Sequence, residues 1–131
     1  MIELIERTCS DSIREKLTCN IFCALDRALV ELKHVTRWVL ENGEKDPRIT
    51  AAASVGYLHV LSLTVAGWLM ATAAIECIKL LEERNSDTEF LNAKLTTVRY
   101  FATHIMPRVK AHADGMVDSS EIALELTENQ F

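Results

Sequence analysis

Glycine and proline are scarce in this sequence, with four and two residues respectively among 131. These residues normally form the tight turns that separate short strands. Their scarcity therefore argues against an all-β sandwich or barrel and suits a few long helices instead. About half of the residues are apolar and a quarter are charged, which is enough for one hydrophobic core. We expect a single all-α domain over residues 1–131.

An excess of positive charge is also lacking. The formal net charge is −5, and the lysine and arginine residues are scattered along the chain. Proteins that bind nucleic acids usually carry a basic patch or a high pI. The charge pattern therefore predicts no nucleic-acid partner.

The N-terminus lacks the features of a secretory signal peptide. Residues 2–7 form too short an apolar segment for one, and they contain three charged residues. The four cysteines are Cys9, Cys19, Cys23 and Cys77. They allow a disulfide framework as the alternative, but a chain of this length holds a core without one. We interpret them as reduced, small core residues of a cytoplasmic protein.

Apolar residues recur at steps of three and four, which keeps side chains on one helical face. The pattern predicts helices over about 10–42, 47–84 and 87–116. For the first helix, Ser10 or Asp11 is the expected N-cap. Asn42-Gly43 is the expected end, with the glycine in the left-handed conformation that terminates many helices. The stripe of this helix comprises Ile13, Leu17, Ile21, Leu25, Ala28, Leu32, Val35 and Val39.

Asp46-Pro47 opens the second helix, with Asp46 as N-cap and Pro47 at the first helical position. We expect this helix to end at Asn85-Ser86 and the third to begin near Asp87. Pro107 lies inside the third pattern and predicts a kink or break there. Residues 117–131 read as a short helical turn and an acidic tail. Together the segments predict an antiparallel up-and-down bundle of three to four long helices.

Residues 49–75 contain no Asp, Glu, Lys or Arg. The stretch exceeds the ~20 residues that a membrane span requires, so a single transmembrane helix is one interpretation. Its many Ala, Ser, Thr and Gly residues make it only moderately apolar, and its flanks show no positive-inside bias. The helices before and after it also need a partner for their apolar stripes. We therefore favour a central core helix, apolar all round and buried between two amphipathic neighbours.

Residues that could carry chemistry do not combine into a complete site. Glu31-x-x-His34 matches half of a di-iron bundle motif, but no second copy exists, so we interpret it as a solvated face. Cys19 and Cys23 lie one turn apart and, with His34, lack the further ligand pair that a zinc site requires.

The remaining candidates favour structural roles too. Trp38 and Trp68 are predicted to be packing anchors, and His104 and His112, two turns apart, have no carboxylate partner for a catalytic dyad. The sequence has no glycine-rich phosphate loop and no nucleophile elbow. We assign no catalytic, cofactor-binding or metal-binding residue.

Several spaced features resemble a known family. Residues 53–71, with Tyr57-Leu58 and then Gly67-Trp68, resemble a helix in the C-terminal extension of large bacterial acyl-CoA dehydrogenases. The subfamily includes the enzymes that act on methylmercaptopropionyl-CoA. Residues 90–101 are similar to the next helix of that extension, Ile105-Met106-Pro107 to its Leu-Leu-Pro step, and residues 123–131 to its closing Leu…Phe. The resemblance covers about Leu25 to the C-terminus.

In that family the flavin, the acyl-CoA thioester and the catalytic glutamate belong to a large upstream region. The resemblance therefore implies an accessory domain that packs against the catalytic body or an identical subunit in a homo-oligomer. FAD is implied for the parent enzyme and no cofactor for this chain. The alternatives are a stand-alone helical dimerisation or interaction module, a single-span membrane protein and a bundle metalloenzyme.

Overall fold

The structure is a computed structural model that describes residues 2–11, 19–83, 87–125 and 130. Within these ranges all regular structure is helical, which confirms the predicted fold class. In chain order the elements are α1 (Ile2–Asp11), α2 (Cys19–Gly43), α3 (Pro47–Glu82), α4 (Thr88–Tyr100), the π-helix η1 (Phe101–Ile105), α5 (Arg108–Ser119) and the 3₁₀ turn η2 (Ile122–Leu124).

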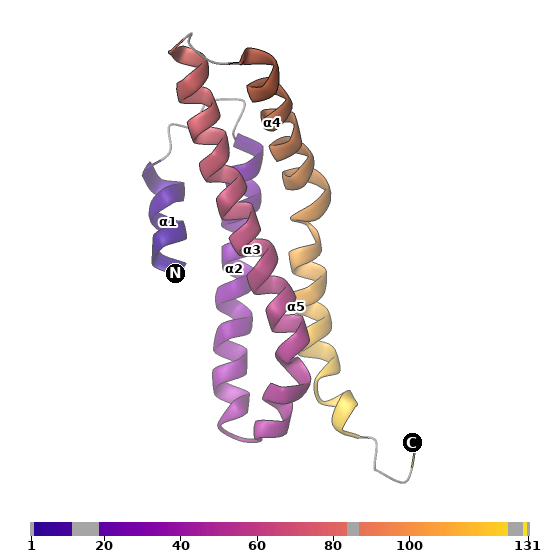
Figure 1. The fold of residues 1–131 in the computed structure, drawn as a ribbon. Helices are drawn as coiled ribbons and strands as arrows, with labels where there is room; N and C mark the ends of the chain where they lie inside the picture. The colour runs from indigo at the N-terminus through magenta and orange to yellow at the C-terminus, as the bar shows by residue number, and fades with distance from the viewer. Residues whose placement is uncertain (1, 12–18, 84–86, 126–129, 131) are drawn as a thin grey trace.

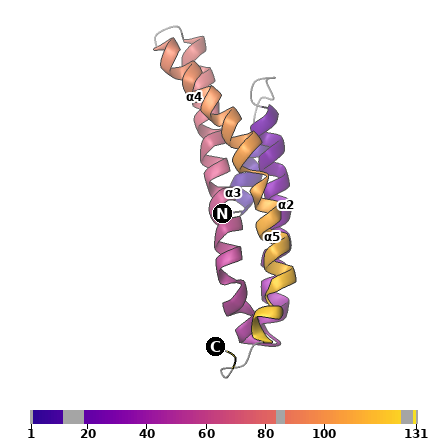
Figure 2. The same ribbon diagram turned by 90° about the vertical axis from the view of Figure 1, so that its right-hand side faces the viewer.

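The long helices form an up-and-down bundle, as predicted. α2 and α3 run antiparallel, and the chain from α4 through η1 to α5 returns beside them (Figure 1). α4 packs along the C-terminal half of α3, whereas α5 packs against both α2 and the N-terminal half of α3 (Figure 2). α1 lies against α2 and buries Ile5 completely.

The first predicted helix was wrong at its start. Ser10 and Asp11 are the last residues of α1 and not an N-cap, and α2 spans Cys19–Gly43. Ile13 and Leu17 lie outside the described residues. The sequence pattern did not predict α1 as a separate helix. A helix of 10 residues has too few apolar positions for its periodicity to be recognised.

The end of α2 was predicted correctly, but for the wrong reason. α2 ends at Gly43, yet Gly43 does not adopt a left-handed conformation. A Cβ atom there would collide with Oγ1 of Thr50, so close approach by the start of α3 is what requires glycine. The turn is held by Asn42, whose carbonyl accepts from the Asp46 N–H at 3.0 Å.

Aspartate residues cap α3 and α4 as the sequence predicts. The Asp46 carboxylate accepts from the Arg48 N–H at 2.9 Å, with Pro47 at the first helical position. The Asp87 carboxylate accepts from the Phe90 N–H at 3.1 Å. Each bond satisfies one of the N–H groups that a helix start leaves free.

The kink predicted at Pro107 is confirmed and takes the form of a π-helix. The Met106 N–H donates to the Phe101 carbonyl five residues earlier, at 3.1 Å. The wider turn relieves the crowding between a proline ring and the preceding carbonyls. We call the continuous segment of α4, η1 and α5 the returning rod. The returning rod changes direction here, between α4 and α5 (Figure 2).

Two glycines of α3 let the returning rod approach closely. A Cβ atom on Gly56 would lie 2.7 Å from Cβ of Met116, and one on Gly67 would lie 2.6 Å from Sδ of Met106. Both methionines are at most 4% exposed. The core around them is completed by Ile21, Leu25, Leu32 and Val35 of α2, Val60 and Ala71 of α3, Leu91, Leu95 and Val98 of α4, and Val109 and Ala113 of α5.

The expectation that α3 is buried all round is wrong. Its buried residues form one stripe, comprising Ala53, Val60, Thr64, Gly67, Ala71, Ala74 and Cys77. Only 28% of the residues in its most apolar window are buried. The physical reason is geometric: α2 and the α4–α5 rod contact α3 from one side, and the opposite side of the helix faces outward.

The glycine contacts predict a graded series of alanine variants. We expect Gly56→Ala to destabilise the fold by about 1–2 kcal/mol, because it collides with Met116 close to the backbone. Gly67→Ala should cost less, because the end of the Met106 side chain is flexible. Gly115→Ala should stabilise by about 0.5–1 kcal/mol, since nothing lies within 4 Å of it. Urea unfolding of the three variants measures the order, and equal effects would contradict the close approach.

Asp46 predicts a specific pH dependence. The hydrogen bonds from the Arg48 side chain and backbone hold the pKa of Asp46 below its ordinary value. Because the folded-state pKa is depressed, the stabilisation is present above the unfolded-state pKa and is lost as the pH falls below about 4. Asp46→Asn keeps a capping oxygen but does not titrate. Its stability should therefore fall less than that of the unsubstituted chain between pH 5 and pH 3; parallel pH profiles would contradict this.

Candidate interaction surface

The outward side of α3 is the most unusual surface of the bundle. Val55, Leu58 and Leu69 are 63%, 59% and 57% exposed. They recur at helical spacing with other uncharged residues, and no charged residue lies between Ile49 and Ile75. We define the outer face of α3 by Val55, Leu58, Ser62, Val65, Leu69 and Thr72. Large exposed apolar surfaces usually mark a contact with another molecule.

The two polar members of this face have their hydroxyls satisfied inside the helix. Ser62 Oγ donates to the His59 carbonyl at 3.1 Å, and Thr72 Oγ1 donates to the Trp68 carbonyl at 3.0 Å. Covering the face would therefore leave neither hydroxyl without a partner, and the usual cost of burying a polar group does not arise. The outer face of α3 behaves as a continuous apolar surface.

Among the described helices, α3 is the one long and apolar enough to cross a membrane by length and composition. Its packing speaks against that interpretation. α2 lies along α3 (Figure 1) and exposes charged side chains, including Arg27, Lys33 and Arg37. Insertion of α3 would carry these charges into lipid at several kcal/mol each or separate the two helices. The charged side of α2 therefore disfavours insertion of α3 together with α2 into lipid.

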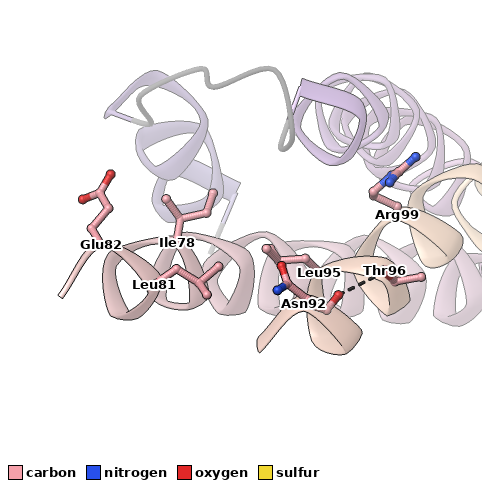
Figure 3. Close-up of a pocket in the computed structure, with 7 residues that line it drawn as sticks. All are labelled: Ile78, Leu81, Glu82, Asn92, Leu95, Thr96 and Arg99. Atoms are coloured by element: carbon pink, nitrogen blue, oxygen red, sulfur yellow. Dashed lines mark hydrogen bonds between the residues drawn. The ribbon is translucent and has the colours of Figure 1, made fainter. Parts of the chain in front are cut away.

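A hollow of about 370 Å³ lies where α3 and α4 meet near their connection. Ile78, Leu81 and Leu95 give it an apolar floor, and Glu82 and Arg99 add charge. Ile78 of α3 and Arg99 of α4 point to the same side of these two helices (Figure 3). Thr96 Oγ1 donates to the Asn92 carbonyl at 3.0 Å and is thereby occupied. The hollow suits an apolar side chain of a partner better than a reacting group.

A second hollow lies between α2 and the π-helix, beside Pro107. Lys110 lies 3.7 Å from Glu31 and 2.9 Å from Asp114. These two carboxylates raise the pKa of Lys110, first through the Asp114 hydrogen bond, and keep the ammonium charged. Glu31 is therefore part of a surface ion-pair group, whereas His34 is exposed.

The histidines of the third predicted helix are not brought together. His104 stacks on Tyr100 with ring centroids 4.3 Å apart, and Thr103 Oγ1 lies 2.9 Å from its Nδ1. His112 instead contacts His59 of α3, with ring centroids 4.5 Å apart. Sequence reasoning missed this second pair, because only the antiparallel crossing of α3 and α5 places the two residues side by side.

The cysteine prediction was correct for one residue and wrong for another. Cys77 is buried, but Cys23 is exposed on α2, because its position falls outside the stripe that faces α3. Cys9 and Cys19 belong to α1 and α2, but their side chains are outside the part that the structure describes. Trp38 and Trp68 pack against the core, as predicted.

No group of three or more His, Cys, Asp or Glu residues that could hold a metal occurs in the described part of the chain. The first hollow is lined by residues of α3 and α4, and the second by residues of α2, η1 and α5 and by the Met106–Pro107 turn. Neither lining contains a glycine-rich loop of the kind that binds the phosphates of a dinucleotide. These hollows therefore do not fit FAD.

Comparison with known protein families gives the bundle an identity. Residues 1–127 match the family described as acetyl-CoA dehydrogenase C-terminal like. The chain belongs to this family. The match covers nearly the whole sequence, including residues 1–24, to which the resemblance in the sequence does not extend. No curated protein sequence matches this C-terminal-like domain.

The contrast between the two sides of α3 in this C-terminal-like domain predicts opposite outcomes for neighbouring substitutions. Leu58→Lys should leave the helical circular dichroism signal unchanged, because the new charge reaches solvent. Val60→Lys should unfold the domain, because Val60 is 0% exposed and belongs to the hydrophobic core, where a charge is costly to bury. Thermal unfolding followed by circular dichroism compares the two. Equal destabilisation would show that the outer face is part of the core.

Proposed function

We propose that this chain is the accessory C-terminal domain of an FAD-dependent acyl-CoA dehydrogenase of the methylmercaptopropionyl-CoA dehydrogenase-like subfamily. It packs against the catalytic body or a neighbouring subunit and supplies no catalytic residue. The family match carries the proposal, and the exposed outer face of α3 supports it, because an accessory domain requires a surface for its partner.

The energetics favour a covered outer face. Val55, Leu58 and Leu69 each leave more than half of their surface exposed. Burying such side chains contributes on the order of 1 kcal/mol or more apiece at about 25 cal/mol per Å². The satisfied hydroxyls of Ser62 and Thr72 add no desolvation penalty to this gain. Association through this face would stabilise both partners.

The family membership suggests a division of labour. Removing the α-proton of an acyl-CoA requires a base, and the following hydride transfer requires a flavin. In the dehydrogenases that this chain resembles, both belong to a large upstream region. We assign these tasks to the catalytic body and a scaffolding task to this domain, in a cytoplasmic homo-oligomer.

The test begins with the reading frame that precedes the Met1 codon. We expect it to continue into a flavoprotein of several hundred codons. That enzyme should then be prepared with and without residues 1–131. Loss of the domain should lower the temperature at which flavin fluorescence is released and reduce the oligomer size, while acyl-CoA-dependent dye reduction tests activity.

An enzyme that keeps its flavin, oligomeric state and activity without the domain would contradict an accessory role. An in-frame stop directly upstream, with no dehydrogenase body that binds the chain, would favour the second candidate function. That candidate is a stand-alone interaction module, and the same exposed face of α3 supports it.

A further inference from the structure

The residues of the outer face of α3 follow a symmetric order. They lie at steps of three and four: Val55, Leu58, Ser62, Val65, Leu69 and Thr72. This spacing is typical of a helix that packs along another helix. Leu58 and Leu69 lie at equal distances along the sequence from the midpoint between Ser62 and Val65. Val55 and Thr72, which have nearly the same shape, are equidistant as well.

We propose that the outer face of α3 pairs with the same face of a second copy of this chain, in an antiparallel arrangement about a two-fold axis. The axis passes between Ser62 and Val65. Each Leu58 then packs on Leu69 of the second copy, and each Val55 packs on Thr72 of the second copy. A two-fold interface requires such self-complementarity, because every contact occurs twice. The inference rests on the proposed function and deepens it by naming the subunit partner.

Charged groups at the ends of the face favour the antiparallel direction. The first charged residues beyond the uncharged stretch are Arg48 on one side and Glu76 on the other. Their side chains are 75% and 58% exposed, and each forms an ion pair in its own chain, Arg48 with Asp46 and Glu76 with Lys79. An antiparallel pair brings each of these ion pairs towards the other one of the second copy, with Arg48 facing Glu76, whereas a parallel pair places identical charges side by side. Antiparallel helix dipoles add to this preference.

The size of the face sets the strength of the dimer. From Val55 to Thr72 the helix is about 26 Å long at ~1.5 Å per residue. A contact along one helix of this length buries less than the ~1,600 Å² of a standard-size interface. The 131-residue chain should therefore dimerise reversibly and in a concentration-dependent manner.

Charge substitutions at the paired leucines test the contact and its direction. Leu58→Arg or Leu69→Glu alone should weaken dimerisation by about tenfold or more in sedimentation equilibrium, because each buries a charge without a partner. The double variant L58R/L69E should recover the dimer. In the antiparallel pairing each introduced arginine meets an introduced glutamate of the second copy, and the recovery should weaken with salt. In a parallel pairing each introduced arginine would meet the arginine of the second copy, and each glutamate the glutamate, so the double variant would not recover the dimer.

Val30→Arg provides the matched control, because Val30 is 65% exposed on α2 and lies outside the outer face of α3. The dimerisation constant of this variant should equal that of the unsubstituted chain. Circular dichroism verifies that each variant is folded. A monomeric unsubstituted chain at millimolar concentration, a dimer insensitive to the single variants, or a double variant that stays monomeric would each overturn the proposal.

These outcomes are separable from the proposed function. A chain that dimerises as described but has no dehydrogenase body would retain this inference and lose the accessory role. A dehydrogenase body that requires the domain, combined with a chain that stays monomeric, would support the accessory role and overturn this inference.

Discussion

The close approach of α3 to the returning rod is the constraint on which the rest of the structure depends. Gly56 and Gly67 remove the side chains that would hold α5 and the π-helix away, and Met116 and Met106 fill the space. Methionine suits this position because its unbranched chain adapts to an irregular gap. With the rod and α2 both in place, the buried stripe of α3 is covered. The outer face of the same helix stays exposed in the described part of the chain.

The uncharged character of α3 is best understood as the sum of two surfaces. One stripe packs within the chain, and the opposite stripe faces outward with its hydroxyls bound to its own carbonyls. A sequence pattern cannot separate these, because a helix that is apolar all round looks the same whether its second partner belongs to the same chain or another. The sequence therefore predicted the helix and its boundaries near Asp46 and Glu82, but not its exposure.

Local chemistry explains which other features could be predicted. Asp46, Asp87 and Pro107 act through neighbouring backbone atoms, so their effects follow from residue type and position. Contacts between distant segments did not follow in this way. The reason for glycine at position 43 lies in Thr50, and the His59–His112 contact depends on how α3 crosses α5. The exposure of Cys23 depends on the azimuth of α2 against its partners, which a single sequence does not specify.

The π-helix has a consequence for how the rod of α4, η1 and α5 follows the rest of the bundle. It interrupts the regular hydrogen-bond ladder between α4, which accompanies the C-terminal half of α3, and α5, which packs against α2 and the N-terminal half of α3. α3 itself continues without interruption from Pro47 to Glu82 past both segments. The widened turn therefore provides the bend through which α4 and α5 approach one continuous helix at two different angles.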